Sequence, residues 1–451
     1  MDITPSLDRH FPRFRHHDPL VPVWCVTPRA GRYTHRFFDT SPISPSGRYL
    51  GVLRLPFEDR LPSPGDVADV ACVDLETGDE TVLATTRGWE HQLGANLNWG
   101  HSDHELFFND VDPSTWTPFA WKVDALTGRR MRLGGTVYHA SPNGRWLISA
   151  NLALTAKTQR GYGVVLPDIA LPSQRVGPVD DEGFWITDTR SGERRLLLSI
   201  KAILDTAAAN ASPVRFDTVA PADTPERCEI TGFHGKFNPQ GDALMLSLRW
   251  FRARERAGWD MFQTDYEAVR FAWITLRIDP ETAVPDLGTL RCATGPDLWQ
   301  HPGHHATWFP DGRRISQNLA LPAVTRDDRL RFVEVNTDGS GLRIIPGTEH
   351  LAGSGHPTLH PDGCHLLTDT YVNEPTAFGD GTVPLRWIDL RSGNEQCLAR
   401  INALNPAVKI HQALRCDPHP AWDRSWRFVV FNGMDGDTRR VYVADMSSLL
   451  V

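Results

Sequence analysis

The sequence lacks a long apolar run, and it has few cysteines. No stretch of about 18 consecutive apolar residues occurs, which is the length that a membrane-spanning helix needs. The N-terminal residues also lack the apolar core of a secretory signal. The seven cysteines are scattered and form no CxxC pair, which argues against a disulfide framework and against a thiolate zinc site. We therefore expect a cytoplasmic protein with no membrane partner.

The chain has no excess of positive charge either. It carries 47 Lys and Arg against 55 Asp and Glu, for a formal net charge of -8. Binding to nucleic acid needs clustered cations that displace counterions from phosphate, so no nucleic-acid partner is expected. A GxSxG nucleophile elbow is also missing, which disfavours a serine hydrolase. Local basic residues could still line a pocket for an acidic substrate.

What the sequence does have is a repeat. Seven segments run through a turn into an apolar strand, as in "YHASPNGRWLISANL", "ATWFPDGRRISQNLA" and "PTLHPDGCHLLTDTY". A second apolar strand closed by an acidic or glycine turn follows each of them, as in "FWITDTRSGERR". A short further strand such as "TVLATT" separates the units. Four short strands per unit are the content of one propeller blade, so the repeat predicts an all-β, seven-bladed β-propeller with four-stranded blades.

The last unit lacks its fourth strand, because the chain stops at Val451. The N-terminal segment "VPVWCVTP" (21–28) has the right pattern to supply it, which would close the ring without an unpaired edge. We therefore expect residues 1–451 to form a single domain. Uneven spacing of the units predicts insertions at about 155–182, 200–228 and 250–268, the second beginning with a short helix.

Histidines occur at one register position in four consecutive blades. His234, His305 and His356 each stand five residues before the proline of their turn, and His419 stands five residues before Arg424, which takes the place of that proline. In a propeller, equivalent positions at the start of the first strands form a ring around the mouth of the channel. Imidazoles in such a ring, joined by a carboxylate, suit a divalent cation such as manganese, zinc or iron. His360 falls outside this register and is expected to point elsewhere.

Further polar residues are expected near this mouth. Asp417 and Gln412 precede His419 and are additional ligand candidates. Arg249 ends an inner strand, and Tyr162 lies in the segment "KTQRGYG". A cationic half-ring opposite a metal would suit an anionic sugar, and the candidates for substrate binding are His35, His139, Arg160, Lys236, Arg252 and His304.

Three stretches carry a family resemblance: "HHATWFPDG", "DPHPAWD" followed by "VYVADM", and "YTHRFFDTSPISPSG". With them the sequence resembles the oligogalacturonate lyase family, cytoplasmic seven-bladed propellers of the TolB-like group. The resemblance implies manganese bound by histidines and a glutamine, and cleavage of oligogalacturonides by β-elimination. Carried over to this chain, it implies His305 and His419 as ligands and adds Gln412. It favours Mn²⁺, with Zn²⁺, Fe²⁺ or Ca²⁺ as alternatives.

The chain departs from the family at two positions. The family has a His-Pro-His-Pro sequence in the last blade, where this chain has Asp417-Pro-His419-Pro. The family's basic histidine on the inner strand of blade four is matched here by Arg249. One ligand would then be a carboxylate, and the substrate would be an oligogalacturonate or a related uronide.

The resulting hypothesis is a metal-dependent lyase that acts on an acidic oligosaccharide. His234 and Arg249 are the candidate bases; if Arg249 only holds the substrate carboxylate, His234 or Tyr162 must act instead. One alternative is a non-catalytic propeller that serves as an interaction platform. Another is a propeller glycoside hydrolase, which would need two carboxylates such as Asp39 and Asp417 across one pocket. The sequence leaves the oligomeric state open.

Overall fold

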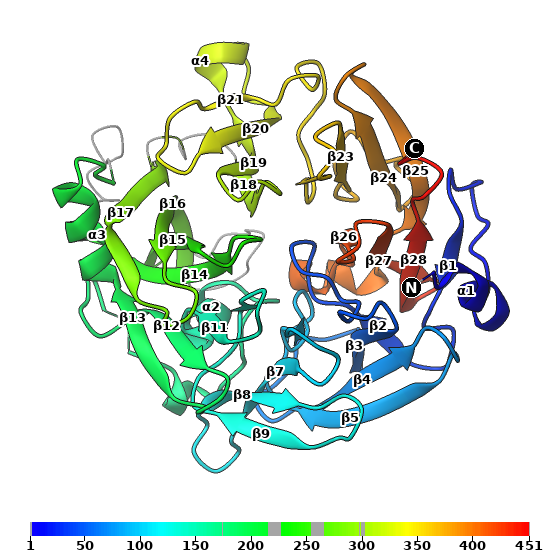
Figure 1. Cartoon of the computed structure of the whole chain (residues 1–451), viewed down its shortest axis with the longest axis horizontal. Coiled ribbons are helices and arrows are strands. Elements are labelled where there is room, and N and C mark those ends of the chain that lie inside the picture. The colour runs from blue at the N-terminus through cyan, green and yellow to red at the C-terminus, as the bar shows by residue number, and fades with distance from the viewer. Residues whose placement is uncertain are drawn as a thin grey trace.

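Seven four-stranded antiparallel sheets surround a central channel in the computed structural model (Figure 1). The structure describes residues 2–173, 175–214, 227–253, 266–296, 298 and 303–450. Each sheet follows the order of its strands along the chain, except the last, whose order is β1-β28-β27-β26. The predicted seven-bladed β-propeller with four-stranded blades is therefore confirmed.

The blades follow one another around the ring, and the first strand of each lies nearest the channel (Figure 1). Blade one consists of β2 (Arg32–Thr34), β3 (Tyr49–Leu55), β4 (Ala68–Asp74) and β5 (Glu80–Thr86). Blade two consists of β6 (Asn98–Trp99), β7 (Leu106–Val111), β8 (Pro118–Val123) and β9 (Arg130–Leu133). Blade three consists of β10 (His139–Ala140), β11 (Trp146–Ser149), β12 (Gly183–Asp188) and β13 (Arg194–Ser199). Blades four and five consist of β14 (Glu229–Phe237), β15 (Ala243–Ala253), β16 (Tyr266–Ile278), β17 (Pro285–Thr294); and β18 (Gly303–Trp308), β19 (Arg314–Ala320), β20 (Leu330–Asn336), β21 (Arg343–Ile344). Blades six and seven consist of β22 (Thr358–Leu359), β23 (His365–Thr368), β24 (Thr382–Asp389), β25 (Asn394–Asn402); and β26 (Ala421–Trp422), β27 (Phe428–Asp435), β28 (Thr438–Asp445) with β1 (Val23–Cys25).

The N-terminal strand closes the ring, as the sequence predicts. In β1, Val23 pairs with Ala444 and Cys25 with Tyr442 of β28. The strand is shorter than the predicted segment 21–28, although hydrogen bonds to β28 continue beyond its ends: the Pro22 carbonyl accepts from the Asp445 amide, and the Val26 amide donates to the Val441 carbonyl. Helix α1 (Thr4–His10) precedes it and packs Leu7 into the core shared by blades one and seven. Both ends of the chain thus contribute to the seam between blades.

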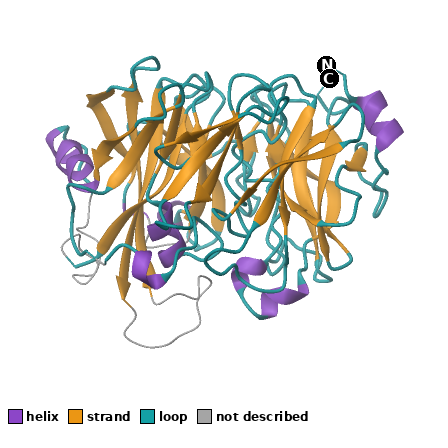
Figure 2. Cartoon of the chain, turned by 90° about the horizontal axis from the view of Figure 1, so that it is seen from below, coloured by secondary structure: helices purple, strands orange, loops and turns teal. Residues whose placement is uncertain are grey.

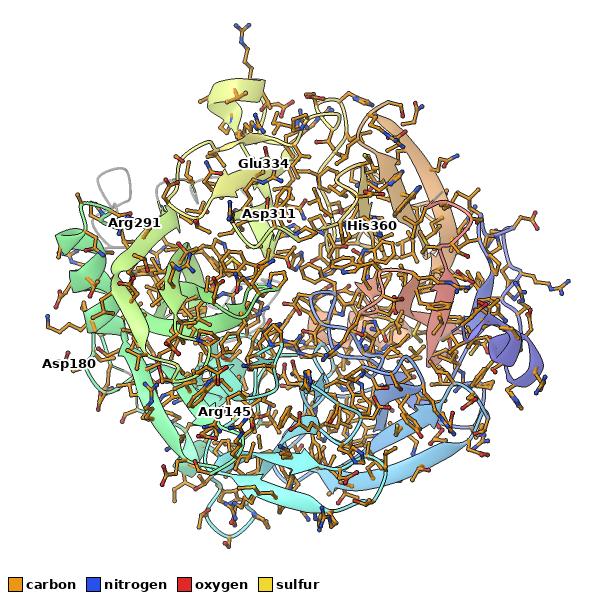
Figure 3. The ribbon with its side chains drawn as sticks, viewed as in Figure 1. Arg145, Asp180, Arg291, Asp311, Glu334 and His360 are labelled. Atoms are coloured by element: carbon orange, nitrogen blue, oxygen red, sulfur yellow. The ribbon has the colours of Figure 1, made fainter. Side chains whose placement is uncertain are left out.

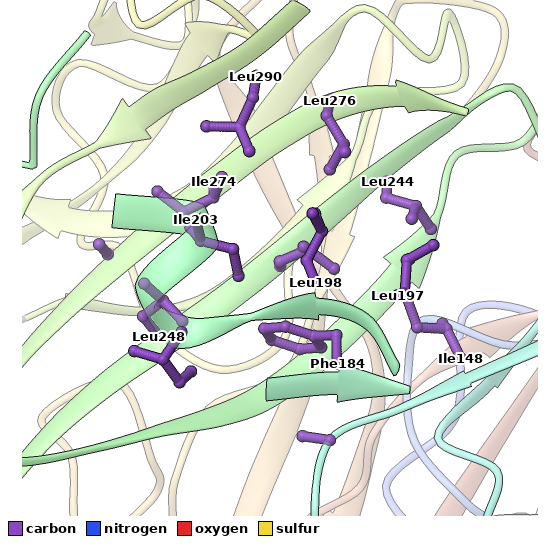
Figure 4. Packing of buried hydrophobic residues seen from close by; sticks show 14 of the residues in the cluster. Ile148, Phe184, Leu197, Leu198, Ile203, Leu244, Leu248, Ile274, Leu276 and Leu290 are labelled. Atoms are coloured by element: carbon purple, nitrogen blue, oxygen red, sulfur yellow. The ribbon is translucent and has the colours of Figure 1, made fainter. Parts of the chain in front are cut away.

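The hydrophobic core lies between neighbouring blades, whose inner strands are mostly buried, whereas fourth strands such as β9 and β25 are exposed over much of their length. The cluster between blades three and four contains Phe184, Leu248 and Ile274, all of them fully buried (Figure 4). Helix α3 (Ile200–Ala209) covers this cluster with Ile203, and its first turn is capped by the Ser199 side chain, which accepts a hydrogen bond from an amide of the helix. Burial of these faces fixes each blade against the next one.

The predicted insertions contribute short helices and strand extensions, and Figure 2 shows short helices outside the ring of strands. The first insertion opens with α2 (Leu152–Thr158) and includes η1 (Asp168–Ala170), and α2 is buried along most of its length. Most of the second beyond α3, 215–226, lies outside the described residues, as does 254–265 of the third, between β15 and β16. The other short helices are α4 (Pro322–Thr325), η4 (Pro406–Lys409) and η5 (Gln412–Leu414). Among the described helices, none has the length and apolar character needed to span a membrane.

The innermost strand of blade one is interrupted. Thr34 pairs with Leu53, whereas the next bridge joins Ile43 to Leu50, so the intervening segment 35–42 leaves the sheet. This excursion brings the rings of Phe37 and Phe38 into contact with the histidines of blades five and six. The functional site is built around it.

Candidate metal centre and cavity

The four histidines of the common register surround the ring of Phe37. Its centroid lies 4.7 Å from that of His419, 5.3 Å from that of His356, 5.9 Å from that of His234 and 6.0 Å from that of His305. All four contacts are edge-on. The structure therefore gathers side chains of blades four to seven at one place, as their shared spacing from the turns predicts.

Irregular backbone places three of these histidines. The pairing of β14 with β15 shifts register between Gly232 and Gly235, on either side of His234. The pairing of β18 with β19 shifts around His305, whose φ is 57°, and His419 has a φ of 49°. A bulge adds an unpaired residue to a strand and re-aims its side chain. The backbone is thus irregular at the positions where these histidines come together.

Three of the predicted ligands form a compact cluster. The candidate ligand atoms of His356, Asp417 and His419 all lie within 4.8 Å of one another, and all three residues are buried. His419 Nε2 is 3.8 Å from Asp417 Oδ2. Nitrogen and carboxylate donors in this number suit a borderline divalent cation.

The unpaired atoms of this cluster fit a cation. Among the described residues, His356 Nε2 and both ring nitrogens of His419 have no hydrogen-bond partner. Burial lowers the pKa of His419 well below its ordinary value, so the imidazole is neutral and offers a lone pair. A buried polar atom without a partner costs free energy, and a bound cation would remove that cost.

His305 borders the cluster. Its ring lies 4.0 Å from that of His356 and is tilted by 32°. Its Nδ1 is 2.7 Å from the Gly355 carbonyl oxygen, and because a carbonyl only accepts, His305 carries its proton on Nδ1. The lone pair then lies on Nε2, which is 3.3 Å from the Tyr371 hydroxyl. His305 thus lies beside the three clustered ligand candidates but is not one of them.

A cavity of about 400 Å³ adjoins the cluster without being lined by its three residues. Phe37, His305 and Arg415 line it and also contact the cluster, since Arg415 Nε lies 2.7 Å from Asp417 Oδ2. Its other described lining residues are Gln159, Tyr162, Phe233, His234, Arg249, Phe271, Trp273, Gly303, His304, Leu330, Tyr371, Asn373, Glu374 and Gln412. All three proposed catalytic residues and the ligand candidate Gln412 are thus in this cavity.

Arg249 is clamped between two aromatic rings in the cavity wall. Its guanidinium carbon lies 3.6 Å from the centroid of Phe233 and 3.9 Å from that of Phe271. It also donates a hydrogen bond to Gln159 Oε1. Burial lowers its pKa well below the ordinary value, although stacking on two ring faces favours the cation.

His234 faces the same cavity. It stacks on Phe233 at 3.8 Å and on Tyr138 at 4.6 Å. Burial, with the charges of Lys236 and Arg249, lowers its pKa well below the ordinary value. Its Nε2 has no hydrogen-bond partner among the described residues. His234 therefore presents a neutral imidazole to the cavity.

The residues predicted to bind substrate do not all lie in one cavity. His304 lines the cavity, and burial lowers its pKa to about 3. Lys236 and His139 line a different cavity of about 340 Å³, together with Phe38 and Asp39. There Lys236 is committed to a buried ion pair, with its Nζ 2.7 Å from Asp39 Oδ2.

The remaining three do not line the cavity beside the cluster either. His35 is 1% exposed, and burial lowers its pKa to about 3. Arg160 and Arg252 are not among the described lining residues. His360, labelled in Figure 3, bonds the Trp426 carbonyl and is not one of the three cluster residues, as its different register predicts.

Sequence reasoning missed four residues of the site: Gln159, Asp369, Tyr371 and Arg415. Asp369 and Tyr371 belong to the polar stretch "DTYVNE" directly after β23, and Arg415 stands two residues before Asp417. The common register covers only the starts of first strands, whereas these residues follow a second strand or lie in connections between strands. A polar stretch at the end of an inner strand was the available signal.

The comparisons with known proteins show the fold. Neither a family model nor a curated protein sequence matches the chain. A solved oligogalacturonate lyase in complex with manganese superposes with a TM-score of 0.58 at 13% identity, covering 96% of each chain. The chain shares the fold of oligogalacturonate lyases. A second such lyase, from Vibrio parahaemolyticus, superposes with a TM-score of 0.57 at 13% identity, covering 97% of this chain and 96% of the other.

Proposed function

We propose that the protein is a metal-dependent lyase that cleaves a uronic-acid-containing oligosaccharide, an oligogalacturonate or a related uronide, by β-elimination. The observation that carries this proposal is the buried cluster of His356, Asp417 and His419 beside a cavity that holds a neutral histidine and a stacked arginine. The shared fold supports it, since one lyase of that fold was solved with manganese.

The proposed reaction requires stabilisation of negative charge next to the carbon that loses its proton. The proton at C5 of a uronate is weakly acidic, and negative charge develops on the neighbouring carboxylate as that proton leaves. A divalent cation at the cluster, Mn²⁺ in the first instance, would supply Lewis-acid stabilisation of this charge. His356, Asp417 and His419 would hold the cation, and His305 and Gln412, which line the adjoining cavity, are the further candidates.

His234 is the proposed base. Its depressed pKa keeps it unprotonated at neutral pH, and its Nε2 is not engaged by the described residues. General bases of this kind accelerate proton transfer when they lie within hydrogen-bond reach of the substrate proton. Because His234 lines the cavity and is held between two rings, the backbone and its neighbours fix its direction.

Arg249 is the proposed clamp for the substrate carboxylate. A guanidinium packed against the faces of two rings has little freedom to turn, which suits bidentate binding of a carboxylate by its donors. Loss of its proton would forfeit the cation–π stabilisation, so a role as base is disfavoured.

Tyr162 is the proposed acid. Burial raises its pKa, so the hydroxyl keeps its proton. The same hydroxyl oxygen accepts a hydrogen bond from Arg415, which orients it in the cavity wall. A proton held in this way can be passed to the departing oxygen of the glycosidic bond.

The hydrolase alternative fits the geometry poorly. A glycoside hydrolase needs two carboxyl groups on opposite sides of one scissile bond. Asp39 lines the other cavity and is buried against Arg36 and Lys236, whereas Asp417 lies in the metal cluster. The interaction-platform alternative offers no reason for four histidines around Phe37.

The test is near-ultraviolet absorbance during incubation with a panel of uronic-acid oligosaccharides. Elimination creates a conjugated double bond, so absorbance should grow with Mn²⁺ and stop with a chelator. Zn²⁺, Fe²⁺ and Ca²⁺ would be compared in parallel. A flat trace on every substrate would favour the interaction platform, and cleavage products without a double bond would identify a hydrolase.

A further inference from the structure

We propose that Asp369 is a positioning residue, which keeps the ring proton of His356 on Nδ1 and holds the backbone of His419 at the metal cluster. The inference rests on the proposed function, because it concerns the same cluster. Asp369 follows β23 in blade six and is 1% exposed. It is not among the three candidate ligands, and it acts through the residues that are.

Both carboxylate oxygens of Asp369 are used by ligand residues. Oδ1 accepts a hydrogen bond from the backbone amide of His356 at 2.8 Å and lies 2.8 Å from the Nδ1 of the same residue. Oδ2 accepts one from the backbone amide of His419 at 3.0 Å. One buried side chain therefore joins a ligand of blade six to a ligand of blade seven.

The contact with Nδ1 determines the tautomer of His356. A carboxylate offers only acceptors, so Nδ1 must carry the proton. The lone pair of His356 then lies on Nε2, the atom that has no partner among the described residues. A carboxylate behind a ligating imidazole also raises its basicity and fixes its ring plane. Asp369 thus prepares His356 to bind a cation through Nε2.

Gly355 connects Asp369 to a histidine of blade five. Its φ is +61°, and a Cβ at this position would lie 2.2 Å from both the backbone oxygen and Oδ1 of Asp369. The chain can approach Asp369 this closely only with glycine. The Gly355 carbonyl oxygen accepts the Nδ1 proton of His305 and a hydrogen bond from Asn318. Gly355 and Asp369 therefore tie together histidines from three blades.

Replacement by asparagine is a sharp test because it keeps the shape. An asparagine has one acceptor oxygen, whereas Asp369 uses two, so one donor must lose its partner. Blade six also supplies a matched control. Asp362 Oδ2 lies 2.6 Å from His365 Nδ1, and Asp362 Oδ1 accepts two backbone amides, but neither residue lies at the cluster.

The experiment compares Asp369→Asn and Asp362→Asn with the wild-type protein. Mn²⁺ affinity, measured by electron paramagnetic resonance, should fall about 10- to 100-fold in Asp369→Asn, the range found for partners of metal-ligating histidines. It should stay unchanged in Asp362→Asn. Unchanged Mn²⁺ affinity in Asp369→Asn would overturn the inference.

A second measurement needs no Asp369 variant and covers the case that Asp369→Asn does not fold. Nitrogen-15 NMR of the metal-free wild-type protein should show His356 with its proton on Nδ1, assigned by the signal that His356→Gln loses. A proton on Nε2 would overturn the inference. If the wild-type protein binds no Mn²⁺, the proposed function fails, while the tautomer still decides the role of Asp369.

Discussion

His234 and Lys236 are separated by one residue of β14, yet their side chains line different cavities. The rise of a strand places such residues about 7 Å apart along the channel. The Nζ atom of Lys236 lies 5.2 Å from the ring of Phe38, which lines its own cavity, and 5.8 Å from that of Phe37, which lines the other. The two rings thus stand between the two chambers.

Removal of a cluster ligand should abolish metal binding. His356→Ala and His419→Ala each delete one of three donors that lie within 4.8 Å of one another, so Mn²⁺ affinity and Mn²⁺-dependent turnover should fall together. His305→Ala is expected to lose both Mn²⁺ affinity and turnover if His305 also binds the cation. Calorimetric titration with Mn²⁺ checks the binding.

His360→Ala is the control for these variants, because that residue is outside the register and bonds Trp426. If His356→Ala and His419→Ala bind Mn²⁺ as tightly as the wild-type protein does, the metal lies elsewhere.

Removal of the proposed base should separate turnover from binding. His234→Ala should lower kcat by about 10²- to 10⁴-fold, the contribution that a positioned base typically makes. Its Mn²⁺ affinity should remain, because His234 is not part of the cluster. Steady-state kinetics with the uronide that the wild-type protein cleaves measures the effect. A kcat near the wild-type value would exclude His234 as the base.

The clamp role of Arg249 predicts that lysine cannot replace it. Arg249→Lys keeps a positive charge but loses the planar fork and the stacking on Phe233 and Phe271. A charged hydrogen bond is worth about 1.5–3 kcal/mol, so kcat/KM should fall about 10- to 100-fold. Arg252→Lys, in the same strand but outside the described cavity lining, should have little effect. Equal losses in both variants would point to a general disturbance of β15.

Buried histidines should make the protein sensitive to acid. Burial lowers the pKa of His91 to about 3 in the folded state, against about 6.5 in an unfolded chain. Between these values the unfolded state binds more protons, so the stabilisation is complete above about pH 6.5 and is lost as the pH falls. The slope is about 1.4 kcal/mol per pH unit for each such group.

His91→Gln should therefore flatten the dependence of the free energy of unfolding on pH between about 6.5 and 4. Denaturant unfolding at several pH values measures the slope, with His101→Gln at an exposed position as the control. An unaltered slope in His91→Gln would show that His91 does not titrate in this way.

The repeat in the sequence was enough to predict the fold. A turn followed by an apolar strand recurs in every blade, and strands that pack on both faces must be apolar throughout, so the pattern of the blades is local. The closing role of the N-terminal strand also followed from the count of strands in the last unit. The same periodicity placed His234, His305, His356 and His419 in one register, and that register brings them around Phe37.

Only the tertiary structure decided which side chains share a cavity. Lys236 and His139 look equivalent to the site residues in sequence, but they line another chamber together with Phe38, Asp39, Thr40 and Ser41 of the irregular segment 35–42. Asp369 and Arg415 reach the ligands from segments with no repeat signal of their own. The periodicity of the sequence shows which residues occupy equivalent positions in the blades. It does not show which side chains form ion pairs or contact the candidate ligands, because those contacts join different blades and depend on the tertiary structure.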